Sequence, residues 1–87
     1  MCALKMSSCW YLYILRCADG SLYTGITTDL ERRTREHNQG KAGAKYTKAR
    51  RPVELVYSEV SENRSSASIR EAAVKKMSRR EKLALMK

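Results

Sequence analysis

Three short stretches of the chain carry the hydrophobic patterns of β-strands. Residues 10–17 (WYLYILRC) are mostly aromatic or aliphatic and too short for an ordinary helix, so they predict a buried strand. Residues 22–27 (LYTGIT) alternate and predict the second arm of a hairpin that turns at Asp19 and Gly20. Residues 53–60 (VELVYSEV) alternate as well and predict a third strand that starts at Pro52.

The length of the hairpin loop decides which residues share a face of the sheet. A two-residue turn separates Tyr13 from Tyr23, because a shift of one residue moves a side chain to the other face. A three-residue loop over residues 19–21 instead places four residues on one face: Tyr11, Tyr13, Tyr23 and Gly25. Turn chemistry alone leaves both loops open.

Two capping boxes mark the starts of helices. Thr28 with Glu31 predicts a helix that begins at Asp29 and ends near residue 40, and Ser78 with Glu81 predicts a last helix over residues 80–86. Residues 64–77 predict a longer helix between them. The order β-β-α-β-α-α predicts an α+β domain, a three-stranded antiparallel sheet flanked by helices, over residues 10–87 after a short tail at residues 1–9.

Basic residues outnumber acidic ones and cluster in one part of the chain. The 87 residues hold 18 Lys and Arg against nine Asp and Glu, a net charge of +9. Residues 32–51 alone hold eight basic side chains and a single acid, Glu36. This asymmetry predicts a polyanionic partner, with a merely soluble basic surface as the alternative, and it does not tell DNA from RNA.

The segment from residue 40 to residue 51 has no period and reads as a basic loop. Tyr46 either stacks on an unpaired base or folds over the edge of the sheet. The basic side chains around it are the candidate contacts to a nucleic-acid backbone, together with Asn38 on the preceding helix: Lys41, Lys45, Lys48, Arg50 and Arg51.

Hydropathy and cysteine usage indicate a cytoplasmic protein. No apolar run approaches the roughly 20 residues of a membrane helix, so no membrane association is expected. Cys2, Cys9 and Cys17 are an odd number without a C-x-x-C pair, and no apolar leader accompanies them. We therefore expect these cysteines to be reduced thiols in the cytoplasm.

The first helix carries charge on the side that should face the sheet. Leu30, Arg33, Thr34 and His37 share this side, because residues three and four apart are neighbours on a helix. A guanidinium at the rim of the sheet grips phosphate with two parallel hydrogen bonds. The alternative is that Arg33 and His37 extend into solvent.

Glu71 lies between Ala67 and Val74 on one side of the second helix. Mg²⁺ is commonly held by one or two carboxylates together with water and phosphate oxygens, so this glutamate is a candidate metal ligand. The alternative is an ion pair with one of three nearby cations: Arg33, Arg70 or Lys75.

Phosphodiester cleavage requires a proton acceptor, a fixed positive charge and a Lewis acid. Tyr13, Tyr23 or His37 supplies the first, Arg33 the second, and a cation on Glu71 the third. A tyrosine needs help to lose its proton, since its free pKa is about 10. His37, with an unperturbed pKa near 6.5, needs none.

These residues resemble the motifs of the GIY-YIG endonuclease superfamily, in particular its small stand-alone bacterial members. The resemblance is carried by YLYIL at residues 11–15, YTG at 23–25, then Arg33, His37 and Glu71. It implies cleavage of DNA by one active site on the face of a three-stranded sheet, with Mg²⁺ or Mn²⁺ as cofactor. YLY stands where the family has GIY, and YTG where it has YIG.

The resemblance also implies a role for each matching residue. Tyr13 and Tyr23 match the two motif tyrosines and favour the three-residue hairpin loop. Glu71 matches the metal ligand and Gly25 the glycine that keeps the backbone low beneath substrate. On the first helix, the matches are the phosphate-binding Arg33, the proton-transfer residue His37, and Asn38, which assists at the site.

The leading hypothesis is therefore a monomeric nuclease, a hydrolase acting on branched, nicked or damaged DNA in repair or recombination. Because the chain carries no second DNA-binding domain, either a protein partner supplies substrate choice or activity is weak. A nucleic-acid-binding module without turnover is the alternative, and a protein-interaction domain is the third hypothesis.

Overall fold

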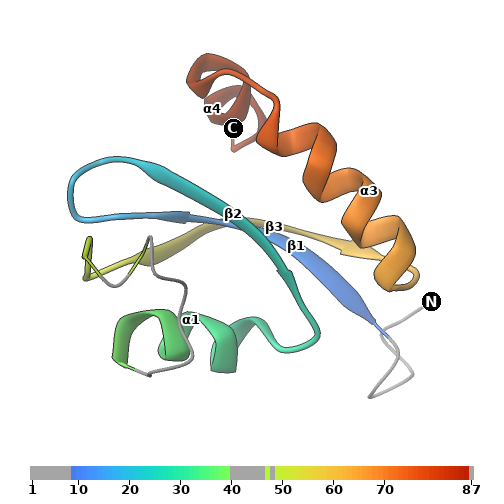
Figure 1. Ribbon diagram of the computed structural model, residues 1–87, viewed down its shortest axis with the longest axis horizontal. Coiled ribbons are helices and arrows are strands. Elements are labelled where there is room, and N and C mark those ends of the chain that lie inside the picture. Colours follow the sequence, from blue (N-terminus) through green and yellow to red (C-terminus); the bar gives the residue numbers. More distant parts are fainter. Residues whose placement is uncertain (1–8, 40–46, 48, 87) are drawn as a thin grey trace.

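The computed structural model describes residues 9–39, 47 and 49–86, which form a three-stranded sheet with helices on both faces (Figure 1). The element order β-β-α-β-α-α and the antiparallel sheet confirm the predicted fold. None of the helices in these ranges is long and apolar enough to cross a membrane. The elements are β1 (Trp10–Arg16), β2 (Leu22–Thr27), α1 (Leu30–Gln39), β3 (Glu54–Ser61), α3 (Arg64–Lys75) and α4 (Arg79–Leu85).

The central strand β1 pairs with β2 on one side and with β3 on the other, so β2 and β3 are the edges. Tyr13 lies opposite Gly25 and Leu15 opposite Tyr23, which confirms that both tyrosines share a face. Thr24 lies opposite Ile14 on the other face, as the resemblance implied.

The hairpin loop has three residues, as the resemblance favoured, but it lies one position earlier than predicted. The Cys17 amide donates to the Ser21 carbonyl (2.8 Å), which leaves residues 18–20 in the turn. Gly20 takes the positive φ of 86° that ends such a loop. Ser21 then donates its amide and hydroxyl to Asp19 Oδ1 (3.0 and 2.6 Å), so it closes the turn and is not part of it.

The start of α1 corrects one of the two predicted capping boxes. Asp29, not Thr28, accepts the Arg32 amide (3.0 Å), while Thr27 Oγ1 accepts the Asp29 amide (3.1 Å). Three consecutive residues with capping side chains compete here, and the aspartate one residue later wins. The capping box of Ser78 and Glu81 at the start of α4 is confirmed.

The face covered by α3 and α4 is an apolar core. Leu12, Ile14 and Val74 are fully buried there. Figure 1 shows both helices on this side of the sheet, and the C-terminal part of the chain packs on the same cluster through Leu85 and Met86. Ala67 and Val74, which the sequence placed on one side of this helix, have no exposed surface.

The face covered by α1 combines a smaller apolar cluster with polar contacts. The cluster contains Tyr13, Leu15, Cys17 and Val53. The side-chain amide of Asn38 donates to the Val53 carbonyl (2.9 Å) and accepts the Val53 amide (2.7 Å), which ties the end of α1 to the segment before β3. This clamp fixes how α1 lies against the sheet.

Candidate active site

The hydroxyl of Tyr13 lies at the centre of the predicted site. Tyr13 is 2% exposed, and its oxygen stands directly over Gly25 on the neighbouring strand. A Cβ atom added to Gly25 would lie 2.5 Å from that oxygen, far inside van der Waals contact. Gly25 therefore makes room for Tyr13, whereas the sequence suggested that it makes room for substrate.

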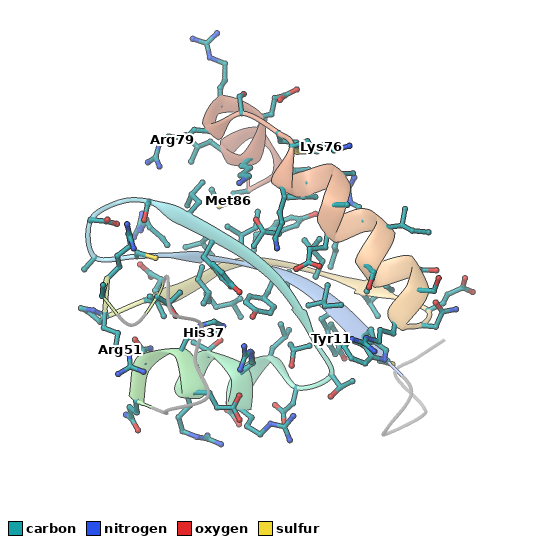
Figure 2. The ribbon with its side chains drawn as sticks, viewed as in Figure 1. Tyr11, His37, Arg51, Lys76, Arg79 and Met86 are labelled. Atoms are coloured by element: carbon teal, nitrogen blue, oxygen red, sulfur yellow. The ribbon has the colours of Figure 1, made fainter. Side chains whose placement is uncertain are left out.

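His37 lies behind this hydroxyl, between α1 and the sheet (Figure 2). The side chain is fully buried, so the alternative that it extends into solvent is wrong. Its Nε2 is 2.9 Å from the Tyr13 hydroxyl and its Nδ1 is 2.7 Å from Thr47 Oγ1. A neutral imidazole has one N–H and one lone pair, so each hydroxyl must complement the nitrogen that it meets.

Burial favours the neutral form of both members of this pair. Desolvation, followed by the charge of Arg33, lowers the pKa of His37 to about 4. Desolvation likewise raises the pKa of Tyr13 to about 12, although a hydrogen bond from Arg33 opposes the rise. The expectation that His37 titrates near its unperturbed value is therefore wrong, because the sequence did not reveal its burial.

Tyr23 completes a cluster of three rings and is only partly buried. Its ring centroid is 6.4 Å from that of Tyr13 and 5.1 Å from that of His37, and the Tyr13 and His37 centroids are 5.9 Å apart. These separations are typical of packed aromatic side chains. The site thus has a buried pair and a more exposed second phenol.

Arg33 lies one turn before His37 on α1, at the rim of the site. Its side chain is 26% exposed, and Nη1 donates to Glu36 Oε1 (3.0 Å) on the same helix. The guanidinium also lowers the pKa of Tyr13 by a hydrogen bond and by its charge. Arg33 is therefore partly exposed to solvent while it also interacts with the buried Tyr13 hydroxyl.

Glu71 lies on α3, which covers the other face of the sheet. Its side chain is 23% exposed, and Oε2 lies 3.3 Å from Lys75 Nζ, so the predicted ion pair exists. The Glu71 charge nevertheless raises the pKa of Tyr13, after the effects of burial, Arg33 and Tyr23. Arg33, Tyr23 and Glu71 thus each influence the pKa of Tyr13, whose hydroxyl also lies 2.9 Å from His37.

A divalent cation fits this carboxylate chemically. A hard cation accepts one protein carboxylate when water and phosphate oxygens complete its shell. Lys75 competes weakly, because its side chain is 54% exposed and surface ion pairs contribute little. Among the residues that the structure describes, no group of three or more His, Cys, Asp or Glu side chains forms a denser metal site.

The candidate nucleic-acid contacts fall into two groups. Lys41, Lys45, Tyr46 and Lys48 lie outside the described residues. The other three take part in the fold. Arg50 Nε donates to Asp19 Oδ2 (3.1 Å), and Arg51 Nε donates to the His37 carbonyl (2.6 Å). Both hydrogen-bonding ends of the Asn38 amide are bonded to Val53, so its contacts are structural.

Thr47 is the residue that the sequence reading missed. It is fully buried and holds Nδ1 of His37. Its position ten residues after His37, in a segment without periodicity, gave no signal in the sequence. Only the fold brings it behind the imidazole.

A family model and several bacterial proteins are similar to this chain over most of its length. A model of the GIY-YIG catalytic domain matches residues 9–84. A UPF0213 protein of Syntrophus aciditrophicus is 58% identical over 77 residues, which cover 88% of this chain and 88% of that protein. A UPF0213 protein of Staphylococcus saprophyticus is 54% identical over 76 residues, which cover 87% of this chain and 92% of that protein.

A solved structure agrees with these matches. The solution NMR structure of a UPF0213 protein from Bacillus halodurans has a TM-score of 0.56 at 47% identity, and the match covers 88% of this chain and 81% of that one. With the matching domain model, the shared strand order and the tyrosine motifs on β1 and β2, the chain belongs to the GIY-YIG family.

Proposed function

We propose that the protein is an endonuclease that hydrolyses DNA phosphodiester bonds with one Mg²⁺ or Mn²⁺. The observation that carries this proposal is the convergence on the Tyr13 hydroxyl. His37 lies 2.9 Å from it, Gly25 lies beneath it, and its pKa responds to Arg33, Tyr23 and Glu71. A side chain of α1 and the backbone of β2 meet at this oxygen, and the charge of Glu71 on α3 also raises its pKa, which supports a reaction centre here.

In the proposed reaction the buried pair accepts the proton of the attacking water. Tyr13 takes that proton while its own phenolic proton passes to Nε2 of His37, and the Nδ1 proton is held by Thr47. A free phenolate is never needed, which matters because a Tyr13 pKa of about 12 leaves almost none at pH 7. The attacking oxygen bonds to phosphorus and the bond to the leaving oxygen breaks.

Arg33 links substrate binding to this proton transfer. Its charge is one of the two main reasons why the pKa of His37 is low. A phosphate bound to the guanidinium offsets that charge, so the pKa of His37 rises when substrate arrives. The base is then stronger with substrate than without it.

Glu71 is the residue that would hold the divalent cation. When bound, the cation supplies a Lewis acid that stabilises the charge on the phosphate and on the leaving oxygen. In this role Glu71 contributes one ligand, and its partial burial between Ala67 and Val74 fixes where that ligand lies.

The basic segment around Tyr46 is proposed to bind the substrate backbone, and the protein to act as a cytoplasmic monomer on branched or damaged DNA in repair or recombination. The net charge of +9 supports a nucleic-acid partner. A protein partner that supplies substrate choice is part of the same proposal, because one small domain offers few contacts for it.

A nucleic-acid-binding module without turnover is the second candidate. One observation favours it: Tyr13 and His37 are 2% and 0% exposed, so little of the buried pair faces solvent. In that case the site keeps its shape and binds phosphate through Arg33 without cleaving it.

Cleavage assays separate the two candidates. The protein is incubated with single-stranded, duplex, flapped and four-way DNA and RNA, with and without Mg²⁺ or Mn²⁺. Glu71→Gln removes the carboxylate that is proposed to hold the cation. Glu62→Gln removes an equal charge from an exposed position and serves as a control. Metal-dependent product that only Glu71→Gln abolishes supports the nuclease. Binding without product on any substrate supports the module.

A further inference from the structure

A small hollow lies where α4 meets the β1–β2 turn, outside the site described above. It has a volume of about 160 Å³ and is lined by Ser21, Leu22, Arg79 and Lys82. A water molecule occupies about 30 Å³ in the liquid, so the hollow has room for a group with the few oxygens of a phosphate. Its two charged lining residues are both cations.

Arg79 is held in place by the turn. Its Nη1 donates to the Gly20 carbonyl (2.7 Å), and Figure 2 shows the side chain reaching from α4 toward the hairpin. A guanidinium has five N–H donors in a planar fork, so this single bond leaves others for a second acceptor. The turn therefore orients the arginine without saturating it.

Among the residues that the structure describes, no acid pairs with the two cations of the hollow. Within the described ranges, neither Arg79 nor Lys82 forms an ion pair. The nearest acid of the turn, Asp19, accepts the Ser21 hydroxyl (2.6 Å) and pairs with Arg50 (3.1 Å). Glu81, the one acid of α4, accepts the Ser78 amide in the capping box.

The hollow lies beside the same edge strand as the candidate active site but on the other face of the sheet, because Leu22 belongs to the α4 side and Tyr23 to the α1 side. Ser21 and Leu22 directly precede Tyr23, and β2 is an edge of the sheet. Two residues of an extended strand span about 7 Å, so Ser21 and Tyr23 are separated by roughly this distance along the edge. A polynucleotide strand that wraps around this edge, from the α1 face to the α4 side, meets both places.

We infer that the hollow binds a backbone phosphate of the nucleic acid, next to the phosphodiester held at the Tyr13 site. Arg79 and Lys82 supply the charge-assisted hydrogen bonds, which are stronger than neutral ones. This inference rests on the proposed function for the position of the scissile bond. The binding of phosphate in the hollow itself requires no cleavage.

The test compares two double variants that remove the same charge. Arg79→Gln with Lys82→Gln empties the hollow of cations, whereas Lys76→Gln with Arg80→Gln removes an arginine and a lysine that do not line it. Binding of a labelled 20-nucleotide single strand and of the matching duplex is measured by fluorescence anisotropy from about 50 to 200 mM NaCl, without divalent cations. Lys82→Gln alone keeps the bond of Arg79 to Gly20, so it tests the hollow without disturbing the contact between α4 and the turn. Thermal melting shows whether each variant is folded.

We expect the hollow variant to bind about tenfold more weakly than the control variant, with a salt slope smaller by about one. Equal losses in both double variants would mean a diffuse basic surface and would overturn the inference, as would no loss in the hollow variant. The nuclease assay with Glu71→Gln is independent. If the wild-type protein cleaves no substrate but the hollow variant still binds more weakly than the control variant, the nuclease proposal is rejected and the phosphate site in the hollow is supported.

Discussion

The two faces of the sheet are built from the same strands and differ sharply in content. On the α3 and α4 face, Leu12 and Ile14 of β1 pack with Val74 in an apolar core. On the α1 face, Tyr13 from between them meets the imidazole of His37, which in turn meets the Thr47 hydroxyl, and all three residues are buried. Alternation along one strand therefore separates an apolar core from the buried polar contacts of the candidate site.

This difference indicates that the buried polar groups of the α1 face add little to the stability of the fold, which depends mainly on apolar burial on the other face. Buried polar groups stabilise little net, and each one left unpaired is expensive. The apolar face gains from burial without such conditions. Substitutions on the two faces should accordingly separate loss of stability from loss of activity, and the expectations below are given in order of decreasing size.

The largest effect on stability is expected at the apolar face. Leu12→Ala deletes a fully buried side chain and should lower the free energy of unfolding by about 2 to 5 kcal/mol. Urea denaturation measures this loss. If the loss were below about 1 kcal/mol, the α3 and α4 face would not be the main source of stability.

Acid should destabilise the α1 face through His37. Its pKa is about 4 in the folded protein and near 6.5 when unfolded, so the unfolded chain binds more protons between these values. The contribution present at pH 7 is lost as pH falls, by about 2 to 3 kcal/mol at pH 4.5. His37→Gln should lack this part of the pH dependence, and equal pH profiles for both proteins would place His37 outside the core.

A smaller loss is expected at Thr47. Thr47→Val keeps the shape but leaves Nδ1 of His37 without its partner at 2.7 Å, which should cost about 1 to 3 kcal/mol. Chemical denaturation measures it, and activity should fall too because the imidazole loses its orientation. A variant as stable and as active as wild type would show that Thr47 does not position His37.

The smallest effect is expected at Thr24, which serves as the matched control. This threonine is 2% exposed, and in the described part of the chain its hydroxyl oxygen has no hydrogen-bond partner. Thr24→Val should therefore leave stability unchanged or raise it slightly, by the same denaturation measurement. A loss as large as that of Thr47→Val would mean that the hydroxyl has a partner after all.

Local patterns predicted the elements of the fold well. Strand alternation placed β2 within its observed bounds, and the capping box of Ser78 and Glu81 placed α4. Where several residues compete for one role, the sequence was ambiguous by one position. This explains the shifts at Asp29 and at the hairpin loop, since neighbouring caps and turn residues differ little in free energy.

The sequence proposed the members of the candidate site but could not predict their contacts. The family motif identified the side chains, whereas long-range contacts decided their environment. Burial of His37 depends on the clamp between Asn38 and Val53, and its second bond depends on Thr47. Residues 10 to 15 positions apart in an aperiodic segment carry no local signal, so neither contact could be foreseen.

The most direct test of the central claim is metal-dependent cleavage by Tyr13→Phe. This variant keeps the ring and removes only the hydroxyl on which the site converges. We predict that its cleavage rate falls about 10² to 10⁴-fold while the protein stays folded and still binds DNA. Cleavage at the wild-type rate by folded Tyr13→Phe would contradict the account.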